Sequence, residues 1–128
     1  MKRSVYNSLI EWKLNKRRKP LILNGARQVG KTYVLQEFAK QEFSKYVYVS
    51  LDRNEKAKKI LESEASVQSI ILTLSALTGI DITPNETLII IDEIQESPKA
   101  LNVLKFFCED APEYPYVLRY VFRPLNAS

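Results

Sequence analysis

PLILNGARQVGKT, residues 20–32, is the stretch around which we expect the fold to be organised. Its apolar run at residues 21–23 predicts a buried strand, and helix-like sequence follows from Tyr33. Between the two, residues 25–32 fit G-x-x-x-x-G-K-[ST], the pattern of a phosphate-binding P-loop. The strand–loop–helix order around the pattern is the context that such a loop requires. The segment therefore predicts a phosphate-binding site.

The residue types in this loop suit the binding of a polyphosphate. Gly25 and Gly30 allow a tight turn that brings backbone N–H groups close to an anion, and the following helix N-terminus adds unpaired donors. Lys31 can reach the β- and γ-phosphates, and the Thr32 hydroxyl can ligate Mg²⁺. The side chains of Arg27 and Gln28 could equally contact the ligand or face solvent. The predicted binding residues are Gly25, Ala26, Arg27, Gln28, Val29, Gly30, Lys31 and Thr32.

A second strong signal is TLIIID, residues 87–92, in which four consecutive apolar residues predict a strand buried on both faces. Strands alternate with helical patterns along the chain, which indicates an open α/β sheet whose ligands lie beyond the carboxyl ends of its strands. Asp92 and Glu93 would then emerge on the same rim as the loop. We expect Asp92 to hold Mg²⁺ through a metal-bound water, and Glu93 and Lys31 to be catalytic, Glu93 by orienting or deprotonating the attacking water. The alternative is a pair of solvated acids at a strand end.

The rest of the chain predicts further elements. Apolar periodicity indicates helices near residues 4–16, 33–43, 55–62, 67–79 and 98–110, and strands at 45–51 and 116–122. Gly79 would end one helix, and Ser97 with Pro98 resembles an N-cap followed by proline at the first helical position. Four basic residues precede the first strand and are either a solvated connector or a contact with nucleic acid or phosphate: Lys16, Arg17, Arg18 and Lys19.

Composition narrows the chemistry. The 128 residues are one domain's worth, and 45% hydrophobic with 27% charged residues is ordinary for a soluble globular protein of net charge +4. The sequence has no histidine, which excludes histidine-based catalysis and histidine metal sites. The single Cys108 excludes an intramolecular disulfide and a multi-cysteine zinc site. With no secretory signal and no run near the roughly 20 apolar residues that span a membrane, we expect a cytoplasmic protein.

Three runs, RKPLILNGARQVGKT, LIIIDEIQESPKAL and YNSLIEWK, resemble a family of prokaryotic AAA-type ATPases over roughly residues 1–115. The resemblance implies a three-layer α/β/α P-loop NTPase core with a mainly parallel sheet, and ATP with Mg²⁺ as the ligands. It also implies the roles given above to Lys31, Thr32, Asp92 and Glu93. In the family a C-terminal domain of poorly known function follows the core, a neighbouring subunit supplies an arginine, and nucleic acid is a suspected partner.

The end of the chain departs from this family. After the helix that ends near Asp110, this family continues with an apolar strand and a Gly-Ser segment, and residues 116–128, YVLRYVFRPLNAS, do not match that segment, so no sensor residue is carried over. Spacing does not assign a role to Arg119 or Arg123. We therefore expect the N-terminal part of one AAA-type ATPase domain: a helix and basic connector (1–19), a P-loop core (20–115) and a divergent tail (116–128), with the sheet incomplete at its C-terminal end. A non-catalytic nucleotide-responsive module that binds nucleic acid or protein, and an inactive fragment with an uncovered sheet edge, remain open.

Overall fold

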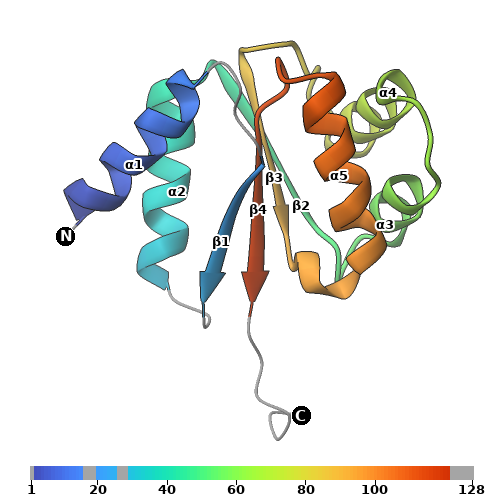
Figure 1. Ribbon diagram of the computed structural model, residues 1–128, viewed down its shortest axis with the longest axis horizontal. Coiled ribbons are helices and arrows are strands. Elements are labelled where there is room, and N and C mark those ends of the chain that lie inside the picture. Colours follow the sequence, from blue (N-terminus) through green and yellow to red (C-terminus); the bar gives the residue numbers. More distant parts are fainter. Residues whose placement is uncertain (1, 16–19, 26–28, 122–128) are drawn as a thin grey trace, which may run out of the picture.

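The computed structural model describes residues 2–15, 20–25 and 29–121, which form four strands and the helices on both sides of them (Figure 1). All strand pairings are parallel, and the strand order is β1-β4-β3-β2. The predicted three-layer α/β/α class is thereby confirmed. In chain order the elements are α1 (Lys2–Leu14), β1 (Leu21–Gly25), α2 (Val29–Glu42), β2 (Lys45–Ser50), α3 (Glu55–Glu62), α4 (Val67–Thr78), β3 (Thr87–Asp92), the 3₁₀-helix η1 (Ile94–Glu96), α5 (Pro98–Asp110) and β4 (Tyr116–Val121).

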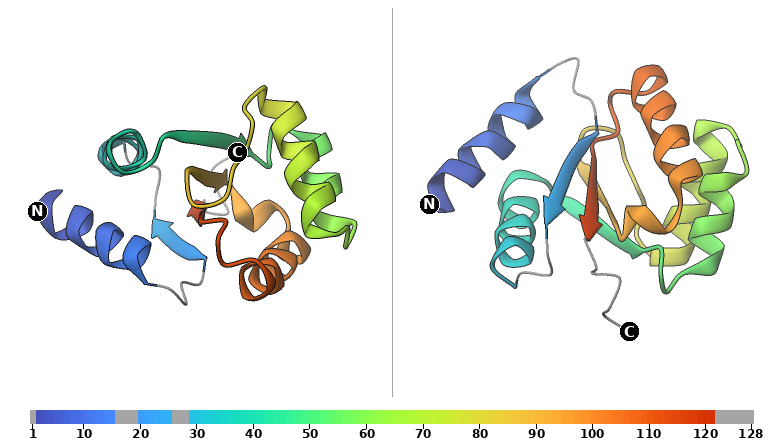
Figure 2. Two further views of the ribbon diagram at one scale, coloured as in Figure 1. Left: turned by 90° about the horizontal axis from the view of Figure 1, so that it is seen from above. Right: turned by 60° about the horizontal axis from the view of Figure 1, so that its bottom comes forward.

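The apolar run of β3 is divided between two hydrophobic cores. Leu88 and Ile90 pack with residues of α1 and α2 on one face of the sheet, whereas Ile89 and Ile91 pack with α3, α4 and α5 on the other face. Successive strand residues point to opposite faces, so a strand covered on both sides must be apolar at every position. Figure 2 shows the two helical layers with the sheet between them. The expectation of a strand buried on both faces is confirmed.

The last described strand lies inside the sheet. A strand was predicted at residues 116–122, and β4 occupies Tyr116–Val121, but its place between β1 and β3 was not predicted. Val117 of β4 pairs with Leu21 on one side and with Ile90 on the other. The sheet therefore continues past residue 115, and among the described residues β1 has a strand on one side alone.

Most helix boundaries follow the predicted capping chemistry. Gly79 ends α4 in the left-handed conformation (φ 73°), and Pro98 is at the start of α5 with Ser97 as its N-cap. One boundary was wrong: α2 begins at Val29 and not near Tyr33, so the last four residues of the P-loop pattern are helical. The apolar positions that mark the helix begin only at Val34, and periodicity could not detect its first turn. The 3₁₀-helix η1 was also not predicted.

Ser97 provides a test of how the helices are held. Its buried side chain (1% exposed) accepts a hydrogen bond from the Ala100 N–H at 3.0 Å, and its hydroxyl donates to Glu62 of α3. We expect Ser97→Ala to lower the free energy of unfolding by about 1–2 kcal/mol, because it removes a cap and a bond between helices. Urea denaturation measures this loss. The exposed N-cap of α4, Ser66, is the control, and an equal loss in Ser66→Ala would contradict the special role of Ser97.

Candidate functional site

The carboxyl ends of the four strands meet at one edge of the sheet. Gly25 at the end of β1 pairs with Val121 of β4, and Asp92 at the end of β3 pairs with Ser50 of β2. Because the strands are parallel, the start of α2 and the β3–η1 connection lie at this same edge (Figure 1). Gly25, the start of α2 and the Asp92-Glu93 pair therefore share one rim, as was expected from the alternation of strands and helices along the sequence.

Part of the P-loop pattern is described by its backbone alone. Gly25 is the last residue of β1, and residues 29–32, which include Lys31 and Thr32, form the first turn of α2. The first N–H groups of a helix have no partner within it and carry partial positive charge, so this turn directs donors toward the rim. Ala26, Arg27 and Gln28 lie outside the described residues, as do Arg123 and the basic residues 16–19.

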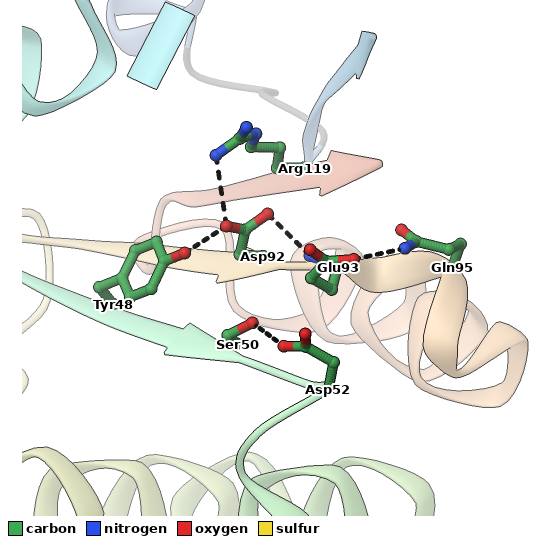
Figure 3. Close-up of polar contacts among 7 residues, drawn as sticks. All are labelled: Tyr48, Ser50, Asp52, Asp92, Glu93, Gln95 and Arg119. Atoms are coloured by element: carbon green, nitrogen blue, oxygen red, sulfur yellow. Dashed lines mark hydrogen bonds and ion pairs between the residues drawn. The ribbon is translucent and has the colours of Figure 1, made fainter. Parts of the chain in front are cut away.

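Three side chains from neighbouring strands converge on the face of the sheet that α2 covers. They belong to Tyr48 of β2, Asp92 of β3 and Arg119 of β4 (Figure 3). The residues two positions earlier on these strands all pack with α1 and α2: Tyr46, Ile90 and Val117. Residues i and i+2 of a strand share a face. The three polar side chains therefore lie at the carboxyl edge on the side where the P-loop pattern leads into α2.

The Asp92 carboxylate is the centre of this cluster. Its Oδ1 accepts a hydrogen bond from the backbone N–H of Glu93 at 2.8 Å. Its Oδ2 accepts bonds from the Tyr48 hydroxyl and, at 3.3 Å, from Nη1 of Arg119 (Figure 3). The ion pair is shielded from water, since the side chains of Arg119 and Asp92 are 14% and 7% exposed. A buried charge of this kind is stable only when it is paired and hydrogen-bonded.

Tyr48 donates to Asp92 as a neutral phenol. Partial burial, followed by the hydrogen bond to Asp92 and the charge of that carboxylate, raises the pKa of Tyr48 above its ordinary value, although the residue is 46% exposed, and the charge of Arg119 opposes this rise. Tyr48 therefore keeps its proton throughout the neutral range and remains a donor to Asp92.

Glu93 has an unusual backbone conformation. With φ 58° and ψ 44° it is in the left-handed region, which costs a residue with a side chain roughly 1–2 kcal/mol. Such strain is concentrated at functional sites. The Glu93 side chain is buried, and its Oε1 accepts a hydrogen bond from Nε2 of Gln95 at 2.6 Å (Figure 3). The turn into η1 and this bond together fix the Glu93 carboxylate beside Asp92.

Sequence reasoning missed the residues that hold the acidic pair. Tyr48, Gln95 and Arg119 contact Asp92 or Glu93, and none of them was assigned a role from the sequence. A signal for two of them was present. Tyr48 and Arg119 lie near the carboxyl ends of their strands, each two residues after a position that packs in the core on the same face. The missing information was the position of β4, which brings Arg119 next to β3.

The described residues fit a magnesium ion held indirectly. A carboxylate offers about four lone-pair positions, and three donors contact Asp92, so one position remains for a metal-bound water. Mg²⁺ retains several waters and takes one or two carboxylates together with substrate phosphates. Within the described ranges no group of three or more Asp, Glu or Cys side chains could enclose a metal.

A parallel four-stranded sheet between helices, with G-x-x-x-x-G-K-[ST] connecting β1 to α2, defines a P-loop NTPase-like core. A family model described as an AAA domain matches residues 17–119, and the chain belongs to this family. The matched range spans the positions of the P-loop pattern, of the acidic pair and of Arg119. No curated protein sequence matched the chain. The fold and the family make this chain a P-loop nucleotide-binding domain.

The helices add one observation about membranes. Within residues 2–15, 20–25 and 29–121, none of them has the length and apolar character that crossing a membrane requires.

The ion pair at the rim predicts a cost for removing its carboxylate. Asp92→Asn leaves the largely buried Arg119 without an anionic partner, and breaking a buried pair in this way costs about 3 kcal/mol. Chemical denaturation should show this fall in the free energy of unfolding. Asp81→Asn, at an exposed aspartate in the connection before β3, should change it by less than about 0.5 kcal/mol. Equal stabilities for the two variants would show that the pair does not stabilise the fold.

Proposed function

We propose that this chain binds ATP with Mg²⁺ through residues 25–32 and is the N-terminal part of an AAA-type ATPase. The observation that carries the proposal is the common rim, where the first turn of α2 and the buried Asp92-Glu93 pair lie at the same edge of the sheet. The resemblance of GARQVGKT and DEIQ to prokaryotic AAA-type ATPases supports it. Nucleotide binding follows from the family, whereas hydrolysis is the further step proposed here.

In this proposal the backbone N–H groups of the loop and the Lys31 ammonium bind the β- and γ-phosphates. The Thr32 hydroxyl would ligate Mg²⁺, and Asp92 would hold the metal through one of its waters. Bound Mg²⁺ supplies positive charge that neutralises the phosphate oxygens. The residues of the chain position the triphosphate at a rim where the acidic side chains are buried.

Glu93 is the proposed general base. Its carboxylate accepts a proton from the attacking water, the water oxygen bonds to the γ-phosphorus, and the bond from that phosphorus to the β,γ-bridging oxygen breaks. ADP and phosphate are the products. The left-handed backbone of Glu93 and the hydrogen bond from Gln95 support this role, because both limit the directions in which the carboxylate can point.

Several finer expectations remain predictions. Assembly into a homo-oligomer and a cytoplasmic location are predictions from the sequence, and no contact among the described residues tests them. Recognition of nucleic acid by residues 16–19 is likewise a prediction, because those residues lie outside the described ranges.

Nucleotide binding is tested first by removing the lysine. We expect Lys31→Ala to weaken the binding of a fluorescent ATP analogue at least tenfold, since a hydrogen bond to a charged group contributes about 1.5–3 kcal/mol. Fluorescence anisotropy with excess Mg²⁺ measures the affinity. Lys40→Ala removes an exposed lysine from the other end of α2 and should bind like the wild type. Equal affinities for all three proteins would refute the proposed site.

Hydrolysis is tested at the acidic pair. Glu93→Gln should retain analogue binding and slow single-turnover hydrolysis of ATP by about 10²–10⁴-fold, the usual contribution of a general base. Quenched reactions with enzyme in excess over ATP give the rate. Glu96→Gln changes an exposed glutamate three residues further on and should leave the rate unaltered. An unchanged rate in Glu93→Gln would exclude Glu93 as the base.

A further inference from the structure

Asp92 has a fixed cation among its partners. Nη1 of Arg119 lies 3.3 Å from Oδ2 of Asp92, and both side chains are largely buried on the α2 face of the sheet. A guanidinium does not lose its proton in proteins, so this positive charge is present at every working pH. The carboxylate that we assign to the metal is therefore already paired with a cation.

A magnesium ion and Arg119 would share this carboxylate. Oδ1 is engaged by the Glu93 N–H, and Oδ2 by Tyr48 and Arg119, so a metal-bound water must approach a carboxylate whose charge the guanidinium partly neutralises. Two cations on one carboxylate repel each other, and they do so more strongly in a shielded site than in water. Arg119 thus opposes the binding of the metal.

The same charge has the opposite effect on a triphosphate that carries no metal. Asp92 and Glu93 would repel such an anion, because both carboxylates lie on the rim to which the first turn of α2 points. Arg119 comes from the adjacent strand on the same face and offsets the charge of Asp92. A triphosphate without a divalent cation would therefore meet less repulsion at this rim than the two carboxylates alone would cause.

We propose that Arg119 is a built-in counter-ion of the nucleotide site, which permits a nucleoside triphosphate to bind without Mg²⁺ and reduces the gain in affinity that Mg²⁺ brings. This inference rests on the proposed nucleotide binding. It assigns to Arg119 a role in specificity, because this residue would set the preference of the site between metal-free and metal-bound triphosphate. A purely structural ion pair would change the stability of the fold and leave that preference unaltered.

The experiment measures the dissociation constant of a fluorescent ATP analogue twice, in EDTA and in excess Mg²⁺. The dissociation constant in EDTA divided by the constant in Mg²⁺ reports the gain in affinity that the metal brings. We expect Arg119→Gln to raise this ratio about tenfold, within the roughly 5–150-fold range that is typical of coupling between bound groups. Most of the change should come from weaker binding in EDTA. Arg119→Lys keeps the charge and should have a ratio close to that of the wild type.

The control variant is Lys45→Gln, which also removes one positive charge. Lys45 is the first residue of β2, at the edge of the sheet opposite to Asp92. The ratio of dissociation constants for Lys45→Gln should therefore equal that of the wild type. Thermal melts show whether each variant is folded. Should Arg119→Gln fail to fold, Arg119→Met, whose apolar side chain replaces the arginine stem, takes its place.

The outcomes separate this inference from the function on which it rests. Binding by the wild type with a ratio that stays within twofold in the Arg119 variants overturns the counter-ion role and leaves nucleotide binding intact. An equal rise in Lys45→Gln overturns it as well, since net charge would then explain the effect. No binding by the wild type in either buffer overturns the proposed function and the inference together.

Discussion

The rim of this domain depends on the pairing of one carboxylate. Asp92 stands at the end of a strand that is buried on both faces, where an unpaired charge would be strongly unfavourable. Three donors resolve this: the next backbone N–H, a phenol from β2 and a guanidinium from β4. Each comes from a different segment, so the carboxylate connects β2, β3, β4 and the start of η1. The same three hydrogen bonds therefore fix the geometry of the site and the alignment of the strand ends.

The pairing also explains why the site has both polar and strained features. Glu93 donates its N–H to the Asp92 side chain, and its backbone then turns from β3 into η1 in a left-handed conformation that few residues other than glycine adopt. Gln95 then contacts the Glu93 carboxylate from the 3₁₀-helix that follows. The strained turn and the hydrogen bond from Gln95 together limit the directions in which the Glu93 carboxylate can point.

Sequence patterns predicted the parts of this structure that are local. The all-apolar run of β3 could be identified because a strand covered on both faces admits few polar residues, and Gly79, Ser97 and Pro98 act through the few residues around them. The P-loop pattern could likewise be identified, because it lies within the consecutive residues 25–32. The role of Arg119 could not be predicted, because it depends on β4 lying between β1 and β3, and no local pattern specifies which strands are neighbours. Tyr48 was missed for a related reason. The sequence showed that it alternates with apolar residues in a strand, but it did not show that its partner Asp92 lies on the neighbouring strand.

The central position of β4 has a consequence for how the chain folds. β1 and β3 are both complete before residue 93 has been synthesised, yet within the described sheet they are joined only through a strand that begins at Tyr116. Within the described sheet, β1 therefore acquires its neighbour only after the residues of β4 have left the ribosome. Until then β1 has no partner among the other described strands, and an apolar strand with unpaired backbone edges is the kind of segment that chaperones protect and that aggregates readily when it is left unprotected.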